Sequence, residues 1–160
     1  MKKYLRYGAV TFVLLIIQTT IVPFTSISNI IPDILMVWIV YVAVRLGQIP
    51  ATVIGFSIGL VMDLISGQFI GLSALAKTIA GFIAGYFYNE NKIDYTIGSY
   101  QFLIIVGLTS LLHNIIYFVI FVQGSEIGFW TAVLRFGLFS TLYTTAIAIL
   151  PVFAFSRKLA

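Results

Sequence analysis

The sequence predicts an all-α integral membrane protein that forms a single domain over residues 1–160. Of the 160 residues, 61% are hydrophobic and 9% are charged, and the mean hydropathy is +1.09. Soluble domains contain about 45–50% apolar and about 25% charged residues. Because a membrane-spanning helix needs about 20 mostly apolar residues, the chain has room for six short spans and for no soluble domain.

Short polar turns separate the predicted spans. Thr25–Asn29 forms the first turn. Pro32-Asp33 opens the second span, since proline is favoured at the first helical position and an acid in the first turn. Residues 89–96 are the most polar segment, and Pro151 is expected to bend or end the last span. The expected spans are residues 5–23, 32–46, 49–65, 70–88, 97–122 and 129–155.

The basic residues predict that both ends of the chain lie in the cytoplasm. Lysine and arginine accumulate in cytoplasmic loops, and with the N-terminus inside, the expected outer loops contain neither residue type. The inner side then holds Lys2, Lys3, Arg6, Arg45, Lys92, Arg157 and Lys158. Membrane orientation therefore explains the net charge of +4, and binding to nucleic acid is not expected. The apolar run after Arg6 is longer than the hydrophobic region of a signal peptide, so we expect an uncleaved first helix.

The segment from Gly55 to Gly71 combines regularly spaced glycines with a single acid. Gly55, Gly59 and Asp63 are four residues apart, so they share one face of a helix. Gly67 and Gly71 follow at the turn. Small residues on one face let a second backbone approach closely within lipid, whereas an ionised, unpaired carboxylate there costs about 2.5–3.5 kcal/mol. The segment is predicted to be a helix-packing seam whose acid needs a partner.

Four charged residues are expected at similar depth in the outer half of the membrane. They are Asp33, Asp63, Lys77 and Arg135. Lys77, Gly81 and Gly85 repeat the four-residue spacing, so the two glycine faces are expected to touch as an antiparallel pair with the charges at its outer end. At about 1.5 Å per residue, Asp63 and Lys77 differ little in depth. The sequence therefore predicts an Asp63–Lys77 or an Asp63–Arg135 ion pair.

The sequence favours a structural or binding role over catalysis. The charged cluster either fixes only the register of the helices, or also binds a partner helix or a small ligand at the outer surface. His113 is expected to be a hydrogen-bonded packing residue, because no second histidine, cysteine or suitably spaced acid forms a metal site with it. The chain has no cysteine, serine elbow, phosphate-binding glycine loop or pair of catalytic carboxylates. We therefore expect no metal, no cofactor and no enzymatic activity.

Several of these motifs resemble the MreD family of bacterial rod shape-determining proteins. The resemblance extends to the six-span layout and the basic N-terminus, and its specific part covers residues 32–85. The motifs that carry it are Pro32-Asp33 before an apolar helix, Gly55-Phe56, Gly59, Asp63-Leu64, Ser66-Gly67 and Gly71-Leu72.

This resemblance implies a helical bundle similar to the S-components of energy-coupling-factor vitamin transporters, and a non-enzymatic role. The family acts as an inner-membrane scaffold of the cell-elongation (rod) complex, or elongasome. The implied partner is MreC, which has one transmembrane span and a periplasmic domain, with indirect links to the MreB filament and to RodA and a penicillin-binding transpeptidase in peptidoglycan synthesis. The residues expected to shape an outer-half groove for a partner's transmembrane helix are Pro32, Asp33, Gly55, Gly59, Asp63, Gly67 and Gly71. Lys77, Gly81, Gly85 and Arg135 complete the expected set.

The sequence leaves two alternative functions. A true S-component captures a vitamin at its outer face, but S-components commonly carry small residues at four-residue spacing on the first helix. The corresponding segment here, Val10–Thr20, is bulky. A small membrane enzyme acting on lipid or peptide would need a nucleophile–base pair, and the sequence shows no such pattern.

Overall fold

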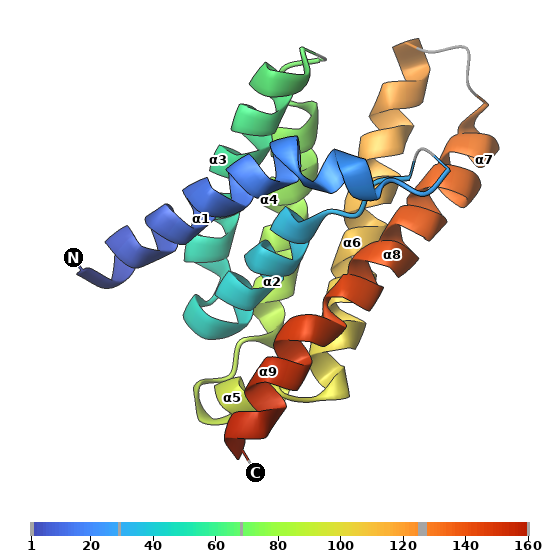
Figure 1. Ribbon diagram of the computed structural model, residues 1–160. Coiled ribbons are helices and arrows are strands. Elements are labelled where there is room, and N and C mark those ends of the chain that lie inside the picture. The colour runs from blue at the N-terminus through green and yellow to red at the C-terminus, as the bar shows by residue number, and fades with distance from the viewer. Residues whose placement is uncertain (1, 29, 68, 125–127, 160) are drawn as a thin grey trace.

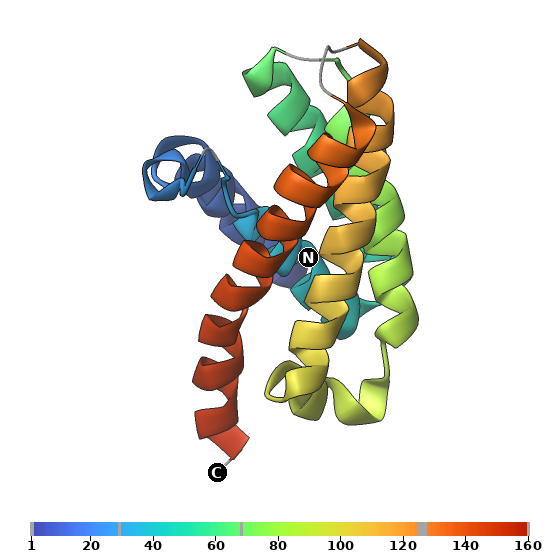
Figure 2. The same cartoon turned by 90° about the vertical axis from the view of Figure 1, so that its right-hand side faces the viewer.

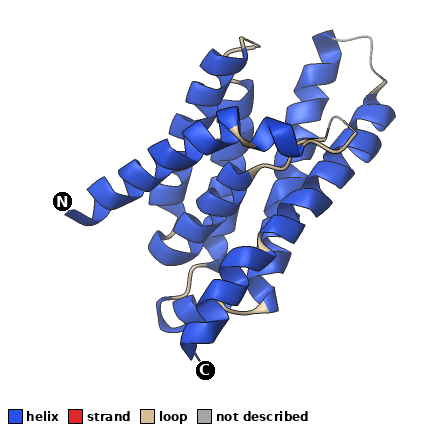
Figure 3. Ribbon diagram, in the orientation of Figure 1, coloured by secondary structure: helices blue, strands red, loops and turns tan. Residues whose placement is uncertain are grey.

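The computed structural model describes residues 2–28, 30–67, 69–124 and 128–159. The described part is almost entirely helical (Figure 3), and outside its helices it contains one β-bridge, between Ile27 and Ile30. The predicted all-α class is therefore confirmed.

The helices follow one another with short connections. α3 and α6 are the longest unbroken helices near the middle of the chain, and the last third contains a π-helical stretch, η5. The elements are α1 (Lys2–Thr20), η1 (Val22–Thr25), α2 (Ile34–Leu46), α3 (Gln48–Ser66), α4 (Leu72–Ala84), η2 (Gly85–Phe87), η3 (Glu90–Lys92), α5 (Ile93–Ile97), α6 (Tyr100–Phe121), η4 (Val122–Gly124), α7 (Phe129–Thr131), η5 (Ala132–Leu138), α8 (Phe139–Ile147) and α9 (Ile149–Leu159).

Three helical runs among the described residues are long and apolar enough to cross a membrane: Gln48–Ser66, Tyr100–Phe121 and Phe129–Ser156. Three shorter apolar helices accompany them, at Leu5–Thr20, Ile34–Leu46 and Leu72–Phe87. These segments overlap the six predicted spans. How many of them cross the bilayer, which end faces the cytoplasm, and the likeness to S-components remain predictions.

α2 forms the centre of the bundle. In Figure 1 it lies between the antiparallel pair α3–α4 and the pair formed by α6 with α7–α9, and it contacts all four of α3, α4, α6 and α8. Its side chains Leu35, Met36, Ile39 and Val40 are fully buried. α2 is thus the short apolar rod around which the longer helices pack.

α1 has a more peripheral position. It runs obliquely across the bundle, and in Figure 2 α1 and the loop after it stand to one side of the other helices. Its Phe12 is 65% exposed, as expected for a side chain that faces lipid. Near its end, however, Gln18 is buried and reaches the start of α2.

The predicted start of the second span was wrong by two residues. α2 begins at Ile34 and Asp33 is its N-cap, so Pro32 lies before the helix and not at its first position. The Asp33 side chain accepts a hydrogen bond of 3.0 Å from the backbone N–H of Met36. An aspartate that caps the first turn in this way satisfies an N–H group that has no partner within the helix.

The fifth and sixth predicted spans are interrupted. The segment 97–122 is divided at Gly98 and Ser99, because the Ser99 hydroxyl accepts from the N–H of Gln101 and caps α6. The segment 129–155 contains the π-helical stretch η5 and a break at Ala148. Pro151 follows that break in the first turn of α9, where its missing N–H group is tolerated.

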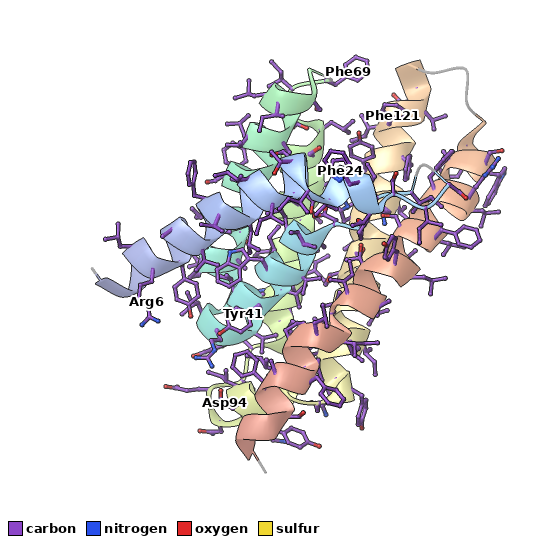
Figure 4. All side chains as sticks on the ribbon, viewed as in Figure 1. Arg6, Phe24, Tyr41, Phe69, Asp94 and Phe121 are labelled. Atoms are coloured by element: carbon purple, nitrogen blue, oxygen red, sulfur yellow. The ribbon has the colours of Figure 1, made fainter. Side chains whose placement is uncertain are left out.

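An exposed ion pair joins α2 to α5 at the C-terminal end of α2. Arg45 at the end of α2 donates to the Asp94 carboxylate of α5 at 3.0 Å, and its guanidinium lies over the rings of Tyr41 and Phe155. Figure 4 shows Tyr41 and Asp94 at this end, whereas Phe69 and Phe121 lie at the other end. The N-terminal end of α2 therefore points toward the end of the bundle that holds the α3–α4 turn and the C-terminal end of α6.

Candidate functional site

Four helical glycines bring α3 and α4 into backbone contact. A Cβ atom at Gly55 would lie 2.6 Å from the Lys77 carbonyl oxygen, and one at Gly59 would lie 2.5 Å from the Ser73 carbonyl oxygen. On the facing helix, Cβ atoms at Gly81 and Gly85 would lie 2.8 Å from the Ala51 carbonyl oxygen and 2.7 Å from the Gln48 nitrogen. All four are shorter than a normal carbon contact. These glycines therefore face the chain's own backbone.

The two turn glycines serve backbone conformation. Gly67 ends α3 with φ of 65° and Gly71 precedes α4 with φ of 100°, and a Cβ atom at either position would have nothing within 4 Å. Positive φ values of this kind favour glycine. These two residues shape the connection that brings α4 back along α3.

Asp63 caps α4 and forms no pair with the predicted cations. Its carboxylate accepts hydrogen bonds from the backbone N–H groups of Gly71 (2.9 Å), Ser73 (3.0 Å) and Ala74 (3.1 Å). The side chain is 1% exposed. A carboxylate at a helix N-terminus is stabilised both by these donors and by the helix dipole. The predicted Asp63–Lys77 and Asp63–Arg135 pairs are therefore wrong.

Lys77 pairs with Asp33 instead. Its ammonium group contacts the second carboxylate oxygen of Asp33, and the two side chains are 4% and 20% exposed. The contact joins α4 to the first turn of α2. Because Asp33 also accepts from the N–H of Met36, one carboxylate caps α2 and neutralises the lysine.

Arg135 lies apart from this charged cluster. It is exposed in η5, and its guanidinium lies 5.9 Å from the centre of the neighbouring Phe136 ring. Among the described residues it forms no ion pair. Arg135 lies in a π-helical stretch, where the side chains no longer follow the 3.6-residue period of an α-helix. The expectation that Arg135 joins the cluster was wrong.

Three side chains from distant parts of the sequence hold the start of α2. The Gln18 amide donates to the Pro32 carbonyl oxygen and accepts from the N–H of Ile34, both at 3.0 Å. The Thr144 hydroxyl accepts from the N–H of Asp33 at 3.0 Å, and the Ser140 hydroxyl donates to the Ile31 carbonyl oxygen at 3.3 Å. Sequence analysis did not identify these residues. A lone glutamine inside the apolar first helix was the one available signal, since a buried amide needs partners.

A cavity of about 370 Å³ lies next to this capped helix start. Its wall combines one carboxylate with uncharged polar and apolar side chains in similar numbers. The end of α1, the start of α2, the end of α3, the middle of α6 and α8 all contribute. The lining residues are Gln18, Thr19, Pro23, Ile31, Pro32, Asp33, Met62, Ile65, Ser66, His113, Asn114, Tyr117, Phe118 and Ser140.

His113 and Asn114 of α6 differ in how their polar atoms are satisfied. The Asn114 amide donates to the Gly137 carbonyl oxygen at 3.1 Å and to the Thr141 hydroxyl at 2.9 Å. His113 is 8% exposed, and its Nε2 atom has no hydrogen-bond partner among the described residues. Its ring stacks near that of Tyr117, with centroids 6.1 Å apart. The burial of His113 beside Tyr117 agrees with the expected packing role, although no hydrogen bond is found at its Nε2 atom.

The described residues include no group of three or more histidine, aspartate or glutamate side chains placed to hold a metal ion. Of the predicted site residues, the cavity takes in Pro32 and Asp33. The helical glycines, Asp63 and Lys77 lie behind its wall, in the contacts among α2, α3 and α4.

The chain was compared with known proteins and families. The sequence model of the family described as "rod shape-determining protein MreD" matches residues 2–159. No curated protein and no solved structure matches the chain in the same comparisons.

Proposed function

Since this chain belongs to the MreD family of rod shape-determining proteins, we propose that it is a non-enzymatic scaffold of the cell-elongation complex. It resides in the bacterial inner membrane as a multi-pass protein and binds MreC. Through MreC it helps to organise the peptidoglycan synthesis carried out by RodA and its transpeptidase partner along the MreB filament.

The cavity supports this proposal because it combines two residues of the predicted site, Pro32 and Asp33, with a space that a partner's side chains could enter. Gly55, Gly59, Gly81 and Gly85 are in contact with the chain's own backbone, so a partner helix cannot also pack on them. Asp33 and Pro32 line the cavity instead. With the N-terminus in the cytoplasm, the start of α2 and the end of α3 lie at the outer side. The periplasmic domain of MreC would lie on the same side.

The size of the cavity defines what can enter it. An α-helix with its side chains is about 10–12 Å across, whereas a space of about 370 Å³ matches the lower range of small-ligand pockets. We propose that the transmembrane helix of MreC packs beside the cavity and that a few side chains next to its span enter it.

The charges around the cavity support a binding role over a catalytic one. Asp33 is paired with Lys77, and Asp63 accepts from three backbone N–H groups of the α4 start. Both carboxylates are thus engaged in structural contacts.

Disulfide crosslinking tests the docking site directly. Because the chain has no cysteine, single cysteines can be introduced without background. Ser66→Cys and Ser140→Cys place a thiol at the cavity, and Ser57→Cys places one on an exposed part of α3 away from it. Each variant is co-expressed with MreC carrying a series of cysteines at the outer end of its span.

We expect crosslinks from Ser66→Cys and Ser140→Cys to the same short stretch of MreC, and none from Ser57→Cys. Equal crosslinking from all three positions would show that the contact is unspecific. Crosslinking from Ser57→Cys alone would place the partner on the exposed face of α3 and refute the cavity as the docking site.

Purification from native membranes tests the function independently of the site. Recovery of MreC with the wild-type chain supports the scaffold role. Recovery of a coupling-factor ATPase in place of MreC would refute it.

A further inference from the structure

The connection between α1 and α2, residues 21–33, exposes large apolar side chains. Ile21, Phe24 and Ile27 are 57%, 90% and 64% exposed. From residue 7 to residue 32 the sequence contains no aspartate, glutamate, lysine or arginine. Exposed apolar side chains that cluster in this way mark a surface for a protein partner or for a membrane.

The backbone of this connection is hydrogen-bonded within the chain. Ile27 and Ile30 each donate to the carbonyl oxygen of the other, at 3.1 and 2.9 Å. The Tyr143 hydroxyl donates to the Thr25 carbonyl oxygen at 3.0 Å, and side chains of α8 and α1 donate to the carbonyl oxygens of residues 31 and 32. In hydrocarbon, non-helical backbone is tolerated only where its polar groups have partners in the protein. These bonds therefore lower the cost of placing the connection in lipid.

The helix α6 indicates the depth of the connection in the bilayer. Its 22 residues make it about 33 Å long, close to the hydrocarbon thickness of about 30 Å, so its ends lie near the two boundaries. In Figure 4, Phe24 lies lower than Phe121, the last residue of α6, and lower than Phe69 of the α3–α4 turn. Figures 1 and 2, related by a turn about the vertical axis, both show the connection below the upper ends of α3 and α6. The connection thus lies between the two ends of α6.

The lengths of the two helices agree with this depth. α2 has 13 residues, so it is about 20 Å long and covers about two thirds of the hydrocarbon thickness. α1 runs obliquely across the bundle (Figure 1), so it advances less along the membrane normal than its length allows. With the predicted orientation, Arg45 places the C-terminal end of α2 at the cytoplasmic boundary. Neither helix then reaches the outer boundary.

We infer that the α1–α2 connection contacts the acyl chains of the outer leaflet through Phe24 and Ile27. α1 and α2 then form a re-entrant hairpin, which enters from the cytoplasmic side and returns to it. The six apolar segments amount to four complete spans and this hairpin, and both ends of the chain stay on one side. Lipid is the partner that fits, because the surface is uncharged, its backbone is bonded internally and it lies at the depth of the acyl chains. The inference does not depend on the binding of MreC.

Spin labels on single cysteines test the depth of the connection. Phe24→Cys carries the probe, and its side chain is exposed enough for the core to stay intact. Phe12→Cys is the matched control for a phenylalanine exposed on an apolar helix, and Gln123→Cys is the control for an exposed residue beyond the end of α6. The chain alone is reconstituted in phospholipid vesicles, without MreC. Collisions of each label with oxygen, which concentrates in lipid, and with a water-soluble nickel chelate are measured by paramagnetic resonance.

We expect the label at residue 24 to collide preferentially with oxygen, like the label at residue 12, and the label at residue 123 to collide preferentially with the nickel chelate. A membrane-impermeant maleimide provides a second readout on the unlabelled thiols. Phe24→Cys is expected to react at least about tenfold more slowly than Gln123→Cys in intact vesicles, because apolar surroundings disfavour the reactive thiolate. After solubilisation in detergent the two rates should become similar. Ile27→Cys should repeat the behaviour of Phe24→Cys.

Three results would overturn the inference. Preference of the label at residue 24 for the nickel chelate would place the connection in water and make α1 and α2 complete spans. A thiol at residue 24 that stays unreactive in detergent would be covered by the chain itself and not by lipid. A label at residue 24 that meets water in vesicles of the chain alone and loses this contact when MreC is added would make the surface a protein interface.

Discussion

The ammonium group of Lys77 contacts the carboxylate of Asp33, so the second turn of α4 is joined to the N-cap of α2 by a nearly buried ion pair. The two residues are 44 positions apart in the sequence. Asp33 also caps α2, and it is one of the residues that line the cavity. The pair therefore connects the packing of the central helix to the wall of the proposed docking site.

Removing the lysine is expected to destabilise the protein strongly. Lys77→Met leaves the Asp33 carboxylate without its counter-ion, and a broken buried pair lowers the free energy of unfolding by about 3–5 kcal/mol. The double variant Asp33→Asn/Lys77→Met removes both charges and keeps a side-chain oxygen for the helix cap. We expect it to recover most of the loss in thermal unfolding measured in detergent. A double variant as unstable as Lys77→Met would show that the charge imbalance is not the cause.

Substitution of Asp63 tests the helix cap. Asp63→Ala removes three hydrogen bonds to the start of α4, and we expect a loss of about 2–4 kcal/mol from a lost cap and the buried N–H groups left unpaired. Asp63→Asn retains one acceptor oxygen and is expected to lie between Ala and the wild type in melting temperature. If the Ala and Asn variants melted at the same temperature as the wild type, the hydrogen bonds to α4 would not contribute to the stability of the fold.

Gly59 is expected to tolerate no side chain. Gly59→Ala forces a Cβ atom against the Ser73 carbonyl oxygen of α4. Because a backbone atom cannot move aside as a flexible side chain can, we expect the free energy of unfolding to fall by about 3 kcal/mol. Gly8→Ala is the matched control in another apolar helix, because a Cβ atom there has nothing within 4 Å. The two melting temperatures are compared in the same detergent. Equal values would contradict the close backbone contact of α3 and α4.

Arg135 is expected to contribute little to the stability of the isolated chain. Arg135→Gln changes an exposed side chain that forms no ion pair among the described residues, so the free energy of unfolding should change by less than about 0.5 kcal/mol. Arg45→Gln is a useful contrast, because Arg45 pairs with Asp94 and lies over two aromatic rings. Thermal unfolding should show the larger shift for Arg45→Gln.

Cysteine labelling tests the predicted orientation and the number of spans. A thiol-specific reagent that cannot cross membranes is expected to label Gln123→Cys in intact spheroplasts, because residue 123 lies in a predicted outer loop. Asn91→Cys lies in a predicted inner loop and should be labelled only after the membrane is permeabilised. The reverse pattern would invert the topology, and labelling of both positions in intact spheroplasts would refute the six-span arrangement.

The sequence predicted a helix–helix contact correctly where the residues that form it share one face of each helix. The four-residue spacing of Gly55 and Gly59, repeated by Gly81 and Gly85, was enough to predict that α3 and α4 pack closely, and their backbones do touch. Spacing also placed Asp63 and Lys77 at similar depth. Spacing could not identify the partners of these two charges, because the depth of a residue in the membrane does not say which neighbouring helix its side chain faces. The long lysine side chain reaches α2, while Asp63 finds N–H groups eight to eleven residues ahead of it.

The remaining site depended on contacts that one sequence does not reveal. Thr144 bonds the N–H of Asp33 across 111 residues, and no local pattern marks it among the other threonines of α8. Arg135 was expected near Asp63 from its depth alone, which does not say toward which neighbouring helix a side chain points, and it lies in a π-helical stretch whose side chains depart from the α-helical period. The cavity itself results from the ends of several helices that meet around α2.

The capping of α4 by Asp63 has a consequence for how the chain enters the membrane. A polypeptide is made and inserted from its N-terminus, so a charge whose partner comes late must wait in lipid without it. Asp63 needs only the residues up to Ala74, and Lys77 meets an aspartate that was synthesised before it. Neither charge depends on α6 or on the helices after it, so these two contacts can form while the second half of the chain is still on the ribosome.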